Sequence, residues 1–363
     1  MDESYGIQNI QNLEDIIAKQ KEKMKRLRDI VKKLSFIPVD SVGNYSCVTY
    51  KAIDGGKMNI EFNPFEMDLI NIADSNGREL FKFVTPKGLM DDIDSNVFSF
   101  LDNLEYIRRF LDLLGKTSVT DISSVLKNSL IAMDIAEYSC IFDRISNNNH
   151  EPVLVMKDGL LRTKSIRQEY VPKMLTILKN NKHAKLVGVS KTSKLLSLIS
   201  SALFIEKVFP PDKVGYVEIP HNLELMAYKW SGQGKIQEGD ILTYAFGKMY
   251  VAKLSRYSNL LVTIEIPFDV HKDEPIYSNS ELSEIFGHLI KDSMFSYPNL
   301  GYPQTIMRAH EKAAMIGFTA SLIKDKVMEK LIDLDDKSLA EYIRDYHLIN
   351  EIVNKGVLGG GFS

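Results

Sequence analysis

Residues 152–159 read Pro-Val-Leu-Val-Met-Lys-Asp-Gly, an apolar run that ends in a charged turn. A short run of this composition is typical of a strand that is buried on both faces of a sheet. Residues 185–190 (KLVGVS) have the same character, and the spacing predicts helices after the two strands, at residues 165–178 and 193–205. Because buried strands alternate with helices here, we predict an α/β fold in which part of the sheet is parallel.

A second block of strands is predicted upstream. Residues 45–53 (YSCVTYKAI) are rich in β-branched and aromatic residues, and they run into the turn signal Asp-Gly-Gly at 54–56. Two more strands are predicted at residues 57–62 and 68–73. We therefore expect an antiparallel meander over residues 45–84 whose first strand ends in an aspartate.

The remaining elements follow from hydrophobic periodicity and turn signals. We predict three parts of the chain: an N-terminal amphipathic helix within residues 1–40, a main domain over 41–335 with a β-rich insertion at about 208–277, and a C-terminal helix with a Gly-rich tail over 336–363. The N-terminal helix itself spans residues 8–34, and its basic face is either solvated or a contact for DNA phosphates or an acidic partner. Further helices are predicted at residues 96–114, 121–145, 280–296, 302–331 and 336–354, and strands within the insertion at 214–219, 241–246, 249–254 and 260–266.

Composition excludes several classes of protein. The chain has 363 residues, a formal net charge of −3 and two cysteines, Cys47 and Cys140, which are too few for a disulfide framework or a cysteine zinc site. No apolar run approaches the roughly 18 residues that span a bilayer, and the N-terminus lacks the pattern of a secretory signal. We expect a cytoplasmic protein with two buried cysteines. Motifs for a P-loop ATPase, a serine hydrolase or a Rossmann dehydrogenase are missing from the sequence.

Two aspartates are the first candidates for chemistry. Asp54 and Asp158 each follow an apolar strand and precede a glycine. If the two strands are neighbours, we expect the two carboxylates to project from the sheet close to each other. Like charges at that range repel unless a cation lies between them. Carboxylate ligands favour Mg²⁺ or Mn²⁺ over Zn²⁺. The other interpretation of each Asp-Gly pair is an ordinary turn.

Three other kinds of side chain complete the candidate site. The predicted helix at 121–145 offers a third carboxylate, for which Glu137 is our choice over Asp134 and Asp143. Lys191 follows the strand at 185–190, where an ammonium group can stabilise a phosphate. His310 follows a segment rich in proline and aromatic residues, and an imidazole there can bind a metal or move a proton.

Five motifs follow one another along the chain: AIDGG at 52–56, a helical glutamate, VMKDGLL at 155–161, VGVSK at 187–191, and YP followed by RAHE within 302–311. In this order they resemble the motifs of the NurA nuclease family, and the resemblance covers about residues 45–325. The chain departs from the family pattern at Leu160, where a serine is usual.

The resemblance implies an RNase H-like mixed sheet flanked by helices, and a Mn²⁺-dependent deoxyribonuclease for which Mg²⁺ is the alternative ion. Family members degrade DNA ends, here taken as 5′-to-3′ exonuclease activity, and cut single strands. They form homodimers and act with HerA, a hexameric DNA-translocating ATPase, in DNA end processing, repair or antiphage defence. The residues carried over are Asp54, Glu137, Asp158 and His310 as metal ligands, Lys191 as a catalytic residue, and Lys191, Tyr302 and Arg308 as contacts to DNA.

Two other functions remain open at this stage. The first is a non-catalytic RNase H-like subunit that docks on a DNA translocase, in which the aspartates are structural turns. The second is a different RNase H-like enzyme, such as a junction resolvase or an Argonaute-like protein acting on RNA. The basic N-terminal helix and the Gly-rich tail are candidate docking elements for the ATPase.

Overall fold

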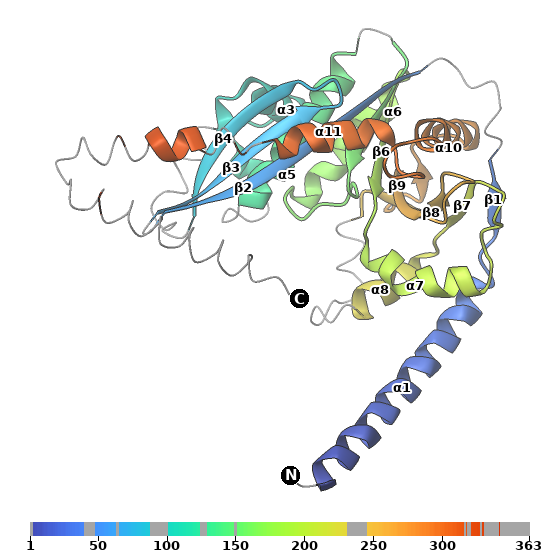
Figure 1. Cartoon of the computed structure of the whole chain (residues 1–363). Helices are drawn as coiled ribbons and strands as arrows, with labels where there is room; N and C mark the ends of the chain where they lie inside the picture. Colours follow the sequence, from blue (N-terminus) through green and yellow to red (C-terminus); the bar gives the residue numbers. More distant parts are fainter. Residues whose placement is uncertain are drawn as a thin grey trace. The chain divides into compact units, whose positions relative to one another are not determined.

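The computed structural model describes most of the chain as two compact units (Figure 1). Unit 1 comprises Met1–Tyr50, Asn148–Thr163 and Val171–Met307, and unit 2 comprises Lys51–Asn147, Lys164–Tyr170 and Arg308–Ser363. The residues that the structure describes are 3–39, 48–62, 65–87, 101–123, 129–148, 151–230, 245–315, 317, 321–326, 329 and 341. The domain boundaries predicted from the sequence stay predictions.

Unit 1 contains a mixed sheet. Its hydrogen-bonded order is β1-β7-β8-β9-β6-β5, with the short β10 beside β9. Strands β5 and β6 pair in parallel, and the other pairs in this order are antiparallel. The strands are β1 (Phe36–Pro38), β5 (Val153–Asp158), β6 (Ala184–Ser190), β7 (Gly215–Glu218), β8 (Gly247–Lys253), β9 (Leu261–Asp269) and β10 (Glu274–Pro275).

Helices accompany this sheet, which confirms the predicted α/β class. After β5 the chain forms α6 (Val171–Asn180), and after β6 it forms α7 (Lys194–Ile205). The helix predicted at residues 165–178 begins later than expected, because Pro172 has no N–H to donate and so falls in the first turn of α6. Unit 1 also contains α8 (His221–Trp230) and α10 (Asn279–Ser293), and α11 (Gln304–Ala314) begins in it.

Within the described residues, the predicted insertion contributes four strands to the sheet of unit 1, namely β7, β8, β9 and the short β10. Helix α8 was not predicted and lies between β7 and β8. The strand predicted at residues 241–246 lies largely outside the described residues, as do the predicted helix at 336–354 and the C-terminal tail.

The N-terminal helix begins and ends earlier in the chain than predicted. It is α1 (Glu3–Val31), and its last turns pack against α7 in a buried apolar cluster that contains Leu27 and Val31 (Figure 1). The Arg28 guanidinium pairs with the Glu206 carboxylate at the end of α7, and this partner lowers the pKa of Glu206. None of the described helices combines the length and the apolar character needed to span a bilayer.

Unit 2 contains the predicted antiparallel meander, but its first strand is continuous where a turn was expected. Strand β2 (Thr49–Phe62) begins in unit 1 and passes through Asp54, Gly55 and Gly56 without a break. It pairs with β3 (Phe65–Asp74), which pairs with β4 (Glu79–Lys87). In this register Asp54 lies opposite Ala73. The predicted end of the strand at Asp54 is therefore wrong.

The reason is the close approach of a helix to β2. Helix α5 (Ser129–Ser146) contributes Met133 and Glu137 at this point. A Cβ atom on Gly55 would lie 2.6 Å from Glu137 Oε1 and 2.7 Å from Met133 Cγ. Gly55 therefore allows α5 to pack closely against an extended strand. This packing keeps the strand extended where the Asp-Gly-Gly sequence alone would favour a turn.

Two further helices of unit 2 pack with α5. They are α3 (Glu105–Leu114) and the short α4 (Val119–Ile122), and the rings of Phe110 and Phe142 join α3 to α5 at 5.4 Å between centroids. The predicted helix at 96–114 is described only from residue 101. Cys140 lies buried in α5, where burial raises the pKa of its thiol, and Cys47 lies outside the described residues.

The substitution Gly55→Ala tests the packing of α5 on β2. The added methyl group would overlap Glu137 and Met133, so we expect the free energy of unfolding to fall by about 1–3 kcal/mol. Urea denaturation followed by circular dichroism measures this change. Gly317→Ala is the control, because a Cβ there meets no atom within 4 Å and should not lower stability. An unchanged midpoint for Gly55→Ala would contradict the proposed role of the glycine.

Candidate functional site

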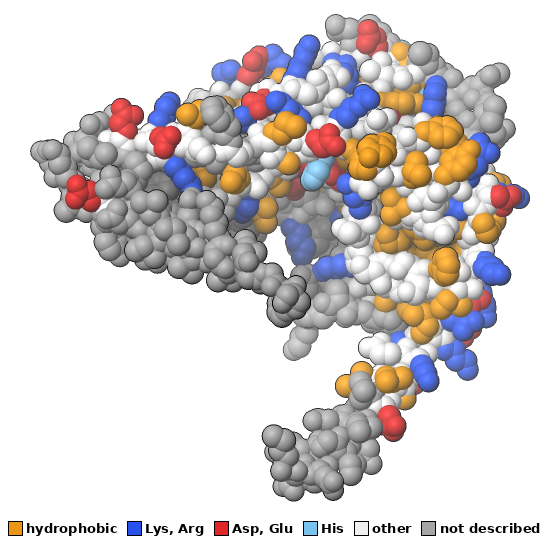
Figure 2. All heavy atoms as spheres, in the orientation of Figure 1, with side chains coloured by type: hydrophobic (Ala, Val, Ile, Leu, Met, Phe, Trp, Pro, Cys, Tyr) orange, Lys and Arg blue, Asp and Glu red, His pale blue; other side chains and the backbone are white. Residues whose placement is uncertain are grey.

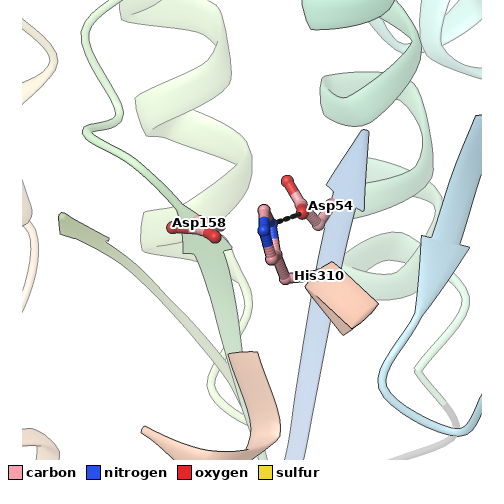
Figure 3. Close-up of side chains that lie close together, drawn as sticks. All are labelled: Asp54, Asp158 and His310. Atoms are coloured by element: carbon pink, nitrogen blue, oxygen red, sulfur yellow. Dashed lines mark hydrogen bonds and ion pairs between the residues drawn. The ribbon is translucent and has the colours of Figure 1, made fainter. Parts of the chain in front are cut away.

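The structure pairs two of the predicted site residues in unit 2. Asp54 is nearly buried on β2, with 7% of its surface exposed, and the His310 side chain on α11 is 57% exposed. His310 Nδ1 lies 2.9 Å from Asp54 Oδ2 (Figure 3). A carboxylate that holds one ring nitrogen fixes the orientation of an imidazole and leaves the other nitrogen for a second partner.

Helix α11 is itself held against the meander by a buried amide. Asn71 on β3 is fully buried, and its Nδ2 atom donates hydrogen bonds to the carbonyl oxygens of Lys312 and Ala313, at 3.3 Å and 3.2 Å. These carbonyls lie in the last turn of the helix, where intrahelical partners are lacking. Asn71 thereby anchors the turn of α11 that follows His310.

Glu137 lies on the side of α5 that faces β2. It is 4% exposed, and its Oε1 atom accepts a hydrogen bond from the Gly55 N–H at 2.9 Å. Of the two other candidate carboxylates, Asp143 accepts a hydrogen bond from Arg109 at 2.8 Å, and Asp134 is partly exposed. These contacts favour Glu137 as the helical carboxylate next to Asp54, and its role as a metal ligand stays a prediction.

Unit 1 carries the second aspartate. Asp158 is the last residue of β5, and Gly159 after it has a φ of 98°, a conformation that favours glycine and turns the chain away. The Tyr302 hydroxyl donates a hydrogen bond to Asp158 Oδ1 at 2.7 Å, and the tyrosine is fully buried. Here the strand ends at the aspartate, as predicted.

The two predicted cationic contacts lie in different surroundings. Lys191 follows β6, and its Nζ lies 4.2 Å from the centroid of the Tyr302 ring, a favourable cation–π geometry. Through Tyr302 it is linked to Asp158 within unit 1. Arg308 is exposed on α11, two residues before His310.

One group of buried charges next to the site was not predicted. Glu265 on β9 is fully buried, and its carboxylate pairs with Arg162, which lies four residues after Asp158. Arg162 also pairs with Glu224 of α8, and the backbone N–H of Arg162 donates to Glu265 Oε2 at 2.9 Å. This network fixes the segment that leaves Asp158. A buried carboxylate amid apolar β9 residues was its only sequence signal.

Several solved structures are similar to this chain at low sequence identity. No protein-family model and no curated protein matches the chain. The NurA nuclease from Sulfolobus solfataricus is similar with a TM-score of 0.47 and 14% identity, over 92% of this chain and 98% of that one. A structure of NurA with manganese has a TM-score of 0.47 and 9% identity, over 89% and 98%. Argonaute from Marinitoga piezophila in complex with a guide RNA has a TM-score of 0.29 and 14% identity, over 73% of this chain and 29% of that one.

The substitution Tyr302→Phe tests the hydrogen bond to Asp158. It removes a donor from a carboxylate without changing the ring, so we expect the free energy of unfolding to fall by about 1–3 kcal/mol. Tyr297→Phe is the matched control, because 83% of Tyr297 is exposed and its hydroxyl is accessible to water. Equal stabilities of the two variants in urea would contradict the role given to the Tyr302 hydroxyl.

Proposed function

We propose that this chain is a divalent-metal-dependent nuclease that hydrolyses phosphodiester bonds in DNA. One observation carries the proposal: within unit 2, His310 Nδ1 lies 2.9 Å from Oδ2 of the nearly buried Asp54, and a carboxylate beside an imidazole is a donor pair that divalent cations accept. Glu137 is included in the proposed ligand set because it contacts the residue next to Asp54.

The donor set fits a hard divalent cation. Carboxylate oxygens are preferred by Mg²⁺ and Mn²⁺, and an added imidazole nitrogen favours the transition metal Mn²⁺. The set lacks the thiolates and the several histidines that select zinc. We therefore propose Mn²⁺ as the resident ion, with Mg²⁺ as the alternative. A bound cation would supply charge stabilisation for the phosphate and would lower the pKa of a water molecule.

The chain's own side chains hold the proposed chemistry in place. When Nδ1 of His310 donates to Asp54, its Nε2 carries the lone pair that can bind the cation or take a proton from water. The Tyr302 hydroxyl fixes the orientation of the Asp158 carboxylate by donating a hydrogen bond to its Oδ1 atom. Both aspartates are thereby oriented before a substrate binds.

We propose that two positively charged side chains, Lys191 and Arg308, contact the phosphates of DNA. Lys191 is held over the Tyr302 ring, and Arg308 is exposed on α11, the helix that also carries His310. Their positive charges would offset the charge that develops on the phosphate during hydrolysis. Tyr302 is the third predicted DNA contact. Its ring is buried, and it holds the Lys191 ammonium group over its face.

The finer parts of the proposal rest on the motif resemblance. We propose 5′-to-3′ degradation of DNA ends, cutting of single strands, a homodimer, and work in the cytoplasm with a HerA-like hexameric ATPase in DNA repair or antiphage defence. Helix α1 is a candidate contact for the ATPase, since it exposes Ile16 and Ile17 beside its lysines.

A cleavage assay tests the function. Purified protein is incubated with labelled linear duplex and single-stranded DNA in Mn²⁺, Mg²⁺ or EDTA, beside the variant Asp54→Asn. We expect cleavage in Mn²⁺, none in EDTA, and a loss of about 100-fold or more in the variant, because a ligand and the anchor of His310 are both weakened.

Asp273→Asn is the control for this assay. Asp273 is exposed and has a φ of 52°, a conformation that asparagine also adopts, so this variant should cleave like the wild type. Full activity of Asp54→Asn would contradict the site. No cleavage in any metal, with and without the HerA-like ATPase, would favour the non-catalytic docking subunit.

A further inference from the structure

A groove of about 550 Å³ runs along α7 in unit 1. The apolar face of α7, which includes Leu195, Ile199 and Leu203, is buried in the core, so the opposite face is the one presented to the groove. That face contributes Ser197, Ser201 and Phe204, and the facing wall is formed by residues 259–261 at the start of β9.

One end of the groove lies at the proposed active site. Lys191 lines the groove and also lies over the ring of Tyr302, whose hydroxyl holds Asp158. Phe204 lines it near the other end of α7. Because α7 has 12 residues, the two ends of this helix are about 18 Å apart.

The groove combines exposed apolar side chains and hydroxyl groups with a single charged residue among the described residues that line it. Phe204 is 72% exposed and Ile205 beside it is 47% exposed. Figure 2 shows hydrophobic side chains exposed on this face over α7 and beside α10. Among the described residues that line the groove, Lys191 is the only charged one, and most of the others carry hydroxyl groups or apolar side chains.

We infer that this groove binds a single strand of nucleic acid that extends from the scissile phosphate, with one base stacked on Phe204. The inference rests on the nuclease function proposed above. An exposed aromatic ring can stack on an unpaired base, whose face is open, but not on a base inside a duplex. Proteins bind duplex DNA mainly through many contacts between Lys or Arg side chains and phosphates. Among the described residues that line the groove, Lys191 alone could make such a contact.

The length of the groove agrees with such a ligand. At 3.4 Å per nucleotide in a stacked strand, about 18 Å holds roughly five nucleotides. This lies within the site sizes of known single-strand binding surfaces. The serine hydroxyls along α7 can donate hydrogen bonds to phosphate and sugar oxygens without reading the sequence.

Fluorescence anisotropy tests the inference. Fluorescein-labelled oligo(dT), oligo(U) and a duplex of equal length are titrated with the full chain in EDTA, which prevents cleavage. We expect Phe204→Ala to weaken the binding of single strands by about 5- to 150-fold, the effect of losing one base–aromatic stack, and to leave the affinity for the duplex unchanged. The two single strands show whether the groove prefers DNA or RNA.

Phe295→Ala is the matched control, since Phe295 is 73% exposed and does not line the groove. It should bind single strands like the wild type, and Phe204→Trp should retain binding because tryptophan also stacks. Unchanged affinity of Phe204→Ala, or equal losses in both alanine variants, would overturn the inference.

The cleavage assay keeps the two proposals distinguishable. If the wild type cuts DNA and Phe204→Ala binds and cuts like it, the groove assignment fails while the nuclease function stands. If the wild type binds single strands through Phe204 but does not cut them in any metal, the nuclease function fails instead.

Discussion

An ionised carboxylate inside a protein is stable only when hydrogen-bond donors or positive charge replace the lost water, and this requirement shapes unit 2. Asp54 and Glu137 are both nearly buried, on β2 and α5. His310 contacts the first of them, and the N–H of Gly55 donates to the second. The contact of Glu137 exists because β2 continues through Gly55 and because this glycine has no side chain to keep α5 away.

In unit 1, too, carboxylates have hydrogen-bond donors or a positive charge beside them. Asp158 is held by the buried hydroxyl of Tyr302, and the fully buried Glu265 is offset by Arg162. The segment from Tyr302 to His310 is of particular interest, since it supplies the hydrogen-bonding partner of each aspartate, one in each unit. A short stretch of chain, most of it the helix α11, thus orients both carboxylates of the proposed metal centre.

The sequence predicts the features that local patterns control. The apolar run before Asp158 and the glycine after it predict a buried strand that ends at the aspartate, and β5 does so, with Gly159 at a positive φ. At Asp54 the same local signal predicts a turn that is absent, because packing of α5 overrides it. The pairings of His310 with Asp54 and of Arg162 with Glu265 join residues 256 and 103 positions apart. Local patterns do not reveal such partners; the motif resemblance predicts a common site for Asp54 and His310, and nothing predicts the pair of Arg162 and Glu265.

The central proposal, that Asp54 and Asp158 bind the same metal ion, is tested most directly by a calorimetric titration. Mn²⁺ is titrated into the wild type, Asp54→Asn, Asp158→Asn and the control Asp273→Asn, after circular dichroism has shown that each is folded. The account predicts that both site variants bind Mn²⁺ at least about tenfold more weakly and that the control is unchanged. Wild-type affinity in Asp158→Asn would contradict it, because the ion would then be bound without the second aspartate.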